Sequence, residues 1–167
     1  MENIEKFMIN VPEKDIDLLH QKIDLTRWPD EINHKWSHGT DLNFLKELTN
    51  YWRNEFNWRD HEKKINDIGS YRYKTKSGLK LHFLHSKSEK DNAIPLVMTH
   101  GWPGSIQEFL KIIPIIQKNS DVPVDIICPA LPGFGFSDKP KEAGMDSKQI
   151  AILQHELLME LGYDKYI

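Results

Sequence analysis

The sequence predicts an α/β fold in which a helical N-terminal segment precedes the first half of a doubly wound, mostly parallel sheet. Three observations lead to this prediction. Apolar residues recur at helical spacing through the first third of the chain, and two strand-like segments joined by a turn follow. In the second half, two continuous apolar runs alternate with helical segments, which is typical of β/α crossovers with buried parallel strands.

The first part of the chain is expected to contain three helices. The first follows Pro12, which suits an opening helical turn. The second begins after Asp41, whose side chain is a good N-cap, and the third runs from Trp58 to a stop near Gly69. We therefore assign residues 1–68 to an N-terminal helical region.

The remainder, residues 69–167, is assigned to an incomplete sheet domain with four strands and two helices. Two strands form a hairpin that turns at Ser77 and Gly78. The runs IPLVMTH and VDIICPAL are expected to be strands buried on both faces, and each precedes a helix. The last helix is expected to stop at Gly162.

Composition excludes several classes of function. The chain has 167 residues and a net charge of −3, which favours neither a nucleic-acid backbone nor an anionic membrane as a partner. Cys128 is the only cysteine, so an internal disulfide is excluded and a reducing compartment is favoured. The N-terminus lacks the apolar core of a signal peptide, and no apolar run approaches the roughly 20 residues that span a bilayer. We expect a cytoplasmic protein.

The stretch HGWPG, residues 100–104, is the first candidate site. Gly101 and Gly104 allow a backbone geometry that a side chain would block, and Pro103 has no N–H and fixes its own backbone angle. The turn is therefore expected to present the peptide N–H of Trp102 outward, as an oxyanion hole requires. His100 is expected to brace the loop by hydrogen bonding. The alternative is an ordinary strand-to-helix turn with a packed tryptophan.

A second loop, LPGFGFSD, follows the next predicted strand. In open α/β sheets ligands bind beyond the carboxyl ends of the strands, so both loops are expected to approach one crevice. Phe134 and Phe136, together with Trp102, are candidates to line an apolar substrate pocket there. Aromatic rings near a loop also serve as simple packing, and this alternative stays open.

Several motifs together resemble the epoxide hydrolases of the α/β-hydrolase fold. HGWPGS, PALPGFGFSDKP and a helix ending in LMELGY resemble the shared core of these enzymes. RWPDEI, YWRNEFNWRDHE and LKLHFLH resemble the N-terminal region of the microsomal-type enzymes. The resemblance extends over residues 10–167 and departs from the family pattern between residues 65 and 79, where NDIGSYRYKTKSG stands.

The resemblance implies hydrolysis of a small-molecule epoxide to a vicinal diol, with no cofactor and no metal. In such enzymes an aspartate opens the epoxide and forms a covalent ester, while two lid tyrosines protonate the epoxide oxygen. A histidine oriented by a carboxylate then activates the water that cleaves the ester. The resemblance also implies that Trp102 N–H binds the oxyanion, and that the Trp102–Pro103 bond is cis.

The resemblance further implies that this chain lacks the nucleophile. In the family the nucleophile follows the next strand, which is expected to begin where the sequence ends at Ile167. The catalytic histidine and the lid tyrosines have no matching position either. We therefore expect the isolated chain to be inactive. Its unpaired apolar strand edge should promote self-association or docking of a C-terminal half.

Other polar residues have structural explanations. Asp146 and Ser105 each precede a predicted helix and are interpreted as N-caps. His82 and His85 are three residues apart in a strand, so they point to opposite faces and cannot share a metal ion. Cys128 is interpreted as a small buried apolar residue.

Two alternative functions remain. The chain could be a non-catalytic fragment that associates with a full-length hydrolase through its open edge. It could also belong to another α/β-hydrolase, such as a haloalkane dehalogenase, although the RWP and FNWR segments argue against that hypothesis.

Overall fold

The structure is a computed structural model that describes residues 3–32 and 36–167. The chain divides into two compact units. One unit consists of residues 10–61, and the other joins residues 1–9 to residues 62–167. The boundary placed after residue 68 from the sequence stays a prediction.

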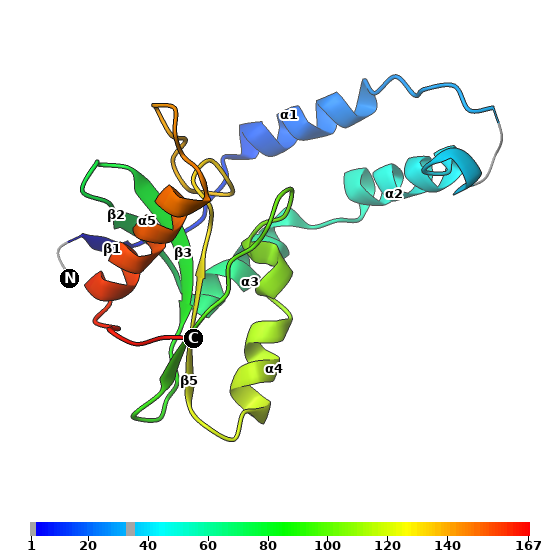
Figure 1. Ribbon diagram of the computed structural model, residues 1–167. Coiled ribbons are helices and arrows are strands. Elements are labelled where there is room, and N and C mark those ends of the chain that lie inside the picture. The colour runs from blue at the N-terminus through cyan, green and yellow to red at the C-terminus, as the bar shows by residue number, and fades with distance from the viewer. Residues whose placement is uncertain (1–2, 33–35) are drawn as a thin grey trace. The chain divides into compact units, whose positions relative to one another are not determined.

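The unit of residues 10–61 is helical, as its apolar spacing predicted. Its elements are α1 (Glu13–Asp24), the short 3-10 helix η1 (Trp36–His38), α2 (Leu42–Asn54) and the beginning of α3 (Trp58–Gly69). The N-cap predicted at Asp41 is confirmed, because its carboxylate accepts a hydrogen bond of 2.9 Å from Phe44 N. Helices α1 and α2 lie alongside each other (Figure 1), and the Arg53 guanidinium donates to both carboxylate oxygens of Asp24 at 3.0 and 3.1 Å.

The other unit contains a five-stranded sheet with the strand order β1-β2-β3-β5-β4. Its strands are β1 (Ile4–Lys6), β2 (Ser70–Lys74), β3 (Lys80–Ser86), β4 (Ile94–Val97) and β5 (Val124–Pro129). Between β4 and β5 the chain forms the 3-10 helix η2 (Ile106–Phe109) and α4 (Ile112–Asn119), and α5 (Ser147–Glu160) follows β5. The predicted hairpin, both apolar strands and the last helix are thereby confirmed.

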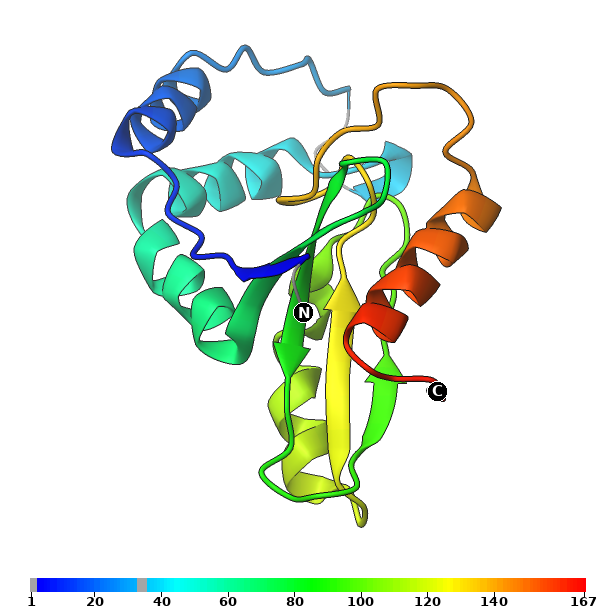
Figure 2. The same ribbon diagram turned by 90° about the vertical axis from the view of Figure 1, so that its left-hand side faces the viewer.

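Helices cover both faces of this sheet. Figure 1 shows α5 on one side of β3 and β5, with α4 on the opposite side, and Figure 2 shows the same strands from the front. The face beneath α5 carries a core of fully or almost fully buried side chains, namely Tyr73, Leu81, Phe83, Ile127, Leu157 and Leu158. This layering confirms the α/β class.

The sheet differs from the prediction in two respects. It is mixed rather than mostly parallel over this part of the chain, because only β4 and β5 pair in parallel and the other three pairings are antiparallel. It also contains β1, which the sequence did not predict. A strand of three residues is too short to show a period of two, and β1 is held by its antiparallel pairing with β2.

Strand β4 is less buried than predicted, because it lies at the edge of the sheet. Its residues are exposed or half-buried, whereas β5, which lies between β3 and β4, is buried along most of its length. The outer side of β4 meets the last residue of the chain. Val97 N donates to Ile167 O at 2.8 Å, and Ile167 N donates to Pro95 O at 2.9 Å, which is the hydrogen-bond pattern of a parallel pair.

Two buried histidines lie in β3. His82 is fully buried and its Nε2 lies 2.8 Å from Ser70 Oγ, whereas His85 is 7% exposed and its Nε2 lies 3.0 Å from Tyr163 Oη. Burial, with a smaller contribution from the positive charge of Arg72, lowers the pKa of His82 to about 4. Burial, reinforced by Lys87 and opposed by Asp125, lowers the pKa of His85 to about 4.

Acidification is therefore expected to destabilise the fold. In the unfolded chain both histidines titrate near 6.5, so between pH 6.5 and pH 4 the unfolded state binds more protons than the folded state. The free energy of unfolding is therefore highest above pH 6.5, and it decreases as the pH falls from 6.5 to 4. The loss is about 2 kcal/mol per histidine at pH 5, measurable by urea unfolding at pH 7 and pH 5. His82→Gln should roughly halve the pH dependence, and equal free energies of unfolding at both pH values would contradict the prediction.

Candidate active site

Two loops leave the sheet at the same edge. Because β4 and β5 run in parallel, the HGWPG loop after β4 and the loop of residues 131–138 after β5 both begin at the carboxyl ends of their strands. The two loops are joined directly, since Leu131 N donates a hydrogen bond of 3.1 Å to His100 Nε2. The predicted approach of the two loops is confirmed.

The HGWPG turn has a defined backbone shape. The Trp102–Pro103 bond is cis, as the family resemblance implied, and Gly104 N donates to Gly101 O at 2.8 Å. A Cβ at position 104 would meet the Glu108 carboxylate, which would have to move away from Ser105 N, and would lie 3.1 Å from Gly101 O. An added Cβ at Gly101 would meet no other atom within 4 Å. The structure therefore gives no steric reason for a glycine at position 101, contrary to the expectation from the sequence.

The peptide N–H of Trp102 is available as a donor. Within residues 3–32 and 36–167, it donates to no backbone or side-chain acceptor, and the Trp102 side chain is 83% exposed. The next residue, Pro103, has no N–H, and the N–H of Ser105 is bound by Glu108 Oε1 at 3.2 Å. The turn therefore leaves an N–H donor free at Trp102.

His100 links the turn to its neighbour. The side chain is 3% exposed, and its Nε2 accepts from Leu131 N, so this nitrogen carries no hydrogen. Its Nδ1, 3.1 Å from Gly101 O, is then the protonated nitrogen and donates to that carbonyl. With both ring nitrogens occupied in this way, His100 contacts the loop after β4 and the loop after β5 at once.

Polar groups that the sequence analysis missed fix the second loop. Ser137 Oγ donates to Ala130 O at 3.0 Å and accepts from His82 N at 2.9 Å. Asp138 and Lys80 exchange two hydrogen bonds, from Lys80 N to Asp138 Oδ2 at 2.9 Å and from Asp138 N to Lys80 O at 2.8 Å. The adjacent Ser-Asp pair that closes a Gly-rich apolar loop is the sequence signal that could have identified them.

Two of the three aromatic candidates, Phe134 and Phe136, pack against different partners. Phe134 packs edge-on against His100, with ring centroids 5.5 Å apart. Phe136 packs against His82 at 5.4 Å and Phe7 at 6.0 Å, and its carbonyl accepts from Arg72 Nη2 at 2.9 Å. These contacts agree with a packing role for Phe136. A role of Phe134 and Phe136 in contacting substrate stays a prediction.

The other polar candidates have the structural roles that were expected. Asp146 caps α5 by accepting from Gln149 N at 2.9 Å, and Ser105 caps η2 within a capping box that includes Glu108. Cys128 is fully buried, and burial raises the pKa of its thiol to about 12, so it is no nucleophile. Among the described residues, no group of three or more His, Cys, Asp or Glu side chains could hold a metal ion.

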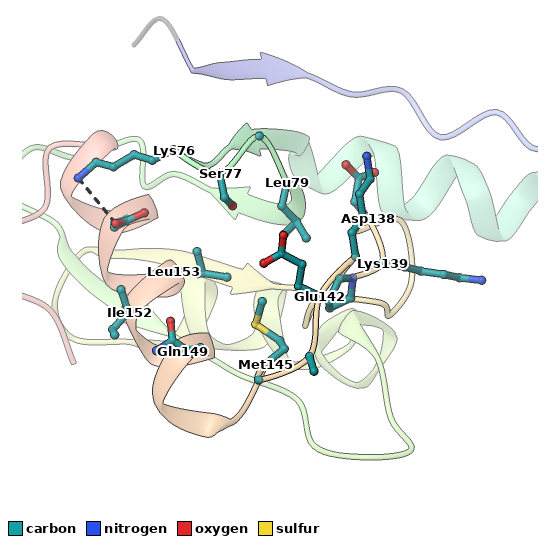
Figure 3. A pocket seen from close by; sticks show the side chains of 16 residues that line it. Lys76, Ser77, Leu79, Asp138, Lys139, Glu142, Met145, Gln149, Ile152 and Leu153 are labelled. Atoms are coloured by element: carbon teal, nitrogen blue, oxygen red, sulfur yellow. Dashed lines mark ion pairs between the residues drawn. The ribbon is translucent and has the colours of Figure 1, made fainter.

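A separate cavity of about 690 Å³ lies between the tip of the β2–β3 hairpin, the segment of residues 138–145 and α5 (Figure 3). Its apolar lining includes Leu79, Met145, Ile152 and Leu153. Two other lining residues form an ion pair, in which Lys76 Nζ lies 3.7 Å from Glu156 Oε1. Trp102 does not line this cavity, so the cavity is not the candidate active site.

Comparison with known proteins places this arrangement in a family. The sequence matches the family described as epoxide hydrolase N terminus over residues 4–109. The chain belongs to the epoxide hydrolase family. Residues 94–167 of this epoxide hydrolase family member also match the family described as alpha/beta hydrolase fold. Among residues 3–32 and 36–167, no helix is both long and apolar enough to cross a membrane.

Individual relatives agree with this assignment. Epoxide hydrolase 1 of the rabbit, Oryctolagus cuniculus, is 36% identical over 99% of the chain. The crystal structure of juvenile hormone epoxide hydrolase from the silkworm Bombyx mori superposes with a TM-score of 0.87 at 29% identity over 98% of the chain. The epoxide hydrolase of Aspergillus niger superposes with a TM-score of 0.83 at 26% identity over 95% of the chain. The chain spans only 38% of the rabbit protein, 45% of the silkworm chain and 43% of the Aspergillus chain.

Replacing the hydroxyl of Ser137 should loosen the second loop. Ser137→Ala leaves His82 N–H and Ala130 C=O buried without this partner, which should lower the free energy of unfolding by about 1 to 3 kcal/mol in a urea titration. The exposed Ser147 at the start of α5 is a matched control, and Ser147→Ala should change stability by less than about 0.5 kcal/mol. Equal effects of the two substitutions would show that Ser137 does not fix the loop.

Proposed function

We propose that this chain supplies the oxyanion-binding half of an epoxide hydrolase active site, with Trp102 N–H as the donor. The observation that carries the proposal is the free N–H of Trp102 in a turn held by Gly104 and His100 at the carboxyl edge of β4. A fixed N–H dipole stabilises the negative charge that develops on oxygen during ester cleavage, and it needs no rearrangement at that moment. His100, Gly101, Pro103 and Gly104 support this donor through the shape of the turn.

The reaction that fits this donor is hydrolysis of a small-molecule epoxide to a vicinal diol through a covalent ester. Ester hydrolysis passes through a tetrahedral oxyanion, whereas opening of the epoxide requires a nucleophile and a proton donor. The names of the relatives, which include epoxide hydrolases of mammals, insects and fungi, support this class of substrate. The proposed reaction belongs to the whole protein and requires neither a cofactor nor a metal.

We propose that the chain by itself does not catalyse this reaction. The side chains considered as possible nucleophiles or bases are engaged in holding the structure. His100 uses both ring nitrogens, Ser105 caps η2, and Cys128 is fully buried with a protonated thiol. None of them is arranged as a nucleophile with an adjacent general base. The single cysteine supports our further proposal that the protein works in the reducing environment of the cytoplasm.

Turnover of styrene oxide tests both proposals. The 167-residue chain should form no more diol than its Trp102→Pro variant, and higher turnover by the parent chain would disprove its proposed inactivity. In a longer protein that contains this chain and hydrolyses epoxides, Trp102→Pro removes the N–H and should lower kcat roughly 100- to 1000-fold. Trp102→Phe keeps the N–H and is the matched control. Equal losses from the two substitutions would exclude the peptide donor and leave the side chain as the cause.

We also propose that the outer edge of β4 binds another strand, from a second copy of the chain or from a C-terminal half. Ile167 occupies part of this edge, and exposed apolar side chains lie along it, with Ile94 38% and Ile167 73% exposed. Gln154, on α5, accepts through its Oε1 a hydrogen bond of 3.2 Å from Thr99 Oγ1, two residues after β4. Its Nε2 is buried and has no partner within the described part of the chain, so an added strand could supply the missing acceptor.

Strand binding at this edge predicts self-association of the purified chain. Size-exclusion chromatography should show oligomers, because an unpaired apolar edge promotes strand pairing between copies. Ile167→Lys should shift the chain towards monomer, whereas Leu25→Lys, at a comparably exposed apolar position after α1, should not. A compact and stable monomer of the parent chain would contradict this prediction.

A further inference from the structure

Beneath the end of α5, three polar side chains form a hydrogen-bonded relay. Tyr163 Oη donates to Asp125 Oδ2 at 2.6 Å, and His85 Nε2 lies 3.0 Å from the same hydroxyl. Since the phenol proton goes to the carboxylate, the hydroxyl oxygen accepts from His85, whose Nε2 therefore carries the hydrogen. The second carboxylate oxygen, Asp125 Oδ1, accepts from Ser88 N at 2.8 Å. Both oxygens of Asp125 are thus occupied.

The relay joins three segments that are distant in sequence. His85 belongs to β3 and Asp125 to β5, whereas Tyr163 follows α5. The rings of His85 and Tyr163 meet edge-on, with centroids 5.9 Å apart. Burial, followed by the hydrogen bond to Asp125, raises the pKa of Tyr163 well above its ordinary value, so the hydroxyl keeps its proton at neutral pH.

Tyr163, the member of the relay that follows α5, stands in the sequence just before the residues that reach β4. The helix exit is fixed by backbone hydrogen bonds, from Gly162 N to Met159 O at 3.0 Å and from Tyr163 N to Leu158 O at 2.9 Å. Asp164, Lys165 and Tyr166 alone separate Tyr163 from Ile167, and a segment of this length reaches about 14 Å at full extension. An anchor at Tyr163 therefore limits which residue of β4 Ile167 can reach. Figure 2 shows this tail running from α5 to β4.

We propose that Tyr163 is a positioning residue whose hydroxyl, held by His85 and Asp125, sets the register in which the segment after α5 pairs with β4. In the observed register Ile167 lies opposite Leu96, because it bonds to Pro95 O and Val97 N. Register matters because a slip of one residue turns every side chain of a strand to the other face. This role goes beyond oxyanion binding and does not depend on catalytic activity.

Disulfide trapping measures this register directly. Ile167→Cys is combined in turn with Ile94→Cys, Leu96→Cys or Met98→Cys. Positions 94 and 96 share one face of β4 and Met98 directly follows the strand, so each alternative cross-link reports a slip of two residues. Cys128 is fully buried and stays out of the reaction. Intramolecular cross-links are distinguished by mass from cross-links between copies, so self-association does not obscure the result. In the parent background, the 167–96 cross-link should form about tenfold faster than either alternative.

Removing the hydroxyl should abolish this preference. With Tyr163→Phe the three cross-links should form at similar rates, whereas Tyr71→Phe, which removes a tyrosine hydroxyl from the same packed cluster, should keep the preference for position 96. Retention of the preference in Tyr163→Phe, or equal loss in Tyr71→Phe, would overturn the proposal.

A second pair of variants, at His85, distinguishes loss of the hydrogen bond to Tyr163 from a general folding defect. His85→Gln keeps an N–H that can donate to the Tyr163 hydroxyl, whereas His85→Leu removes it. The glutamine variant should keep the preference for position 96, and the leucine variant should lose it. If both variants retain the preference, or if both lose it, the relay does not set the register.

Discussion

The parallel pairing of β4 with β5 is the constraint on which the candidate site depends. Leu96 lies opposite Ile126 and Val97 opposite Ile127, and both isoleucines are fully buried. Because the two strands pair in parallel, their two following loops emerge at one edge of the sheet. The antiparallel neighbour β3 begins at that same edge, which brings Lys80 and His82 beside the second loop. The order and direction of β3, β5 and β4 therefore suffice to bring the two loops and the start of β3 together at one edge of the sheet.

Side chains and backbone have different tasks at this edge. The polar side chains of His100, Ser137 and Asp138 bind peptide groups and so hold the two loops in place. The donor in our proposal is a peptide N–H, that of Trp102, which donates to no acceptor within the described part of the chain. A backbone donor has few ways to move once its turn is fixed, which suits stabilisation of a short-lived charge. The buried histidines of β3 belong to the supporting structure, and their low pKa values keep them uncharged at neutral pH.

Sequence reasoning identified the elements with strong local signals. The caps at Asp41 and Asp146 and the buried strand β5 follow from side-chain chemistry within a few residues. It could not identify the contact between His100 and Leu131, because these residues are distant in sequence and meet only through strand order. The packing of Phe136 on Phe7 was out of reach for the same reason. Strand β1 was not predicted, because three residues are too few to show the alternation of apolar and polar side chains that indicates a strand.

The hydrogen bonds between Ile9 and Asn66 have a consequence for the helical unit. Asn66 binds the backbone of Ile9 on both sides, from Ile9 N to Oδ1 at 2.9 Å and from Nδ2 to Ile9 O at 2.9 Å. Ile9 directly precedes residues 10–61, and Asn66 lies in α3 shortly after them. The two hydrogen bonds therefore hold together the parts of the sheet unit between which residues 10–61 are inserted. The helical unit is in effect an insertion into the sheet unit. The entropy of closing a flexible loop grows only slowly with its length, so insertions into the loops of residues 10–61 are expected to cost the sheet unit little stability.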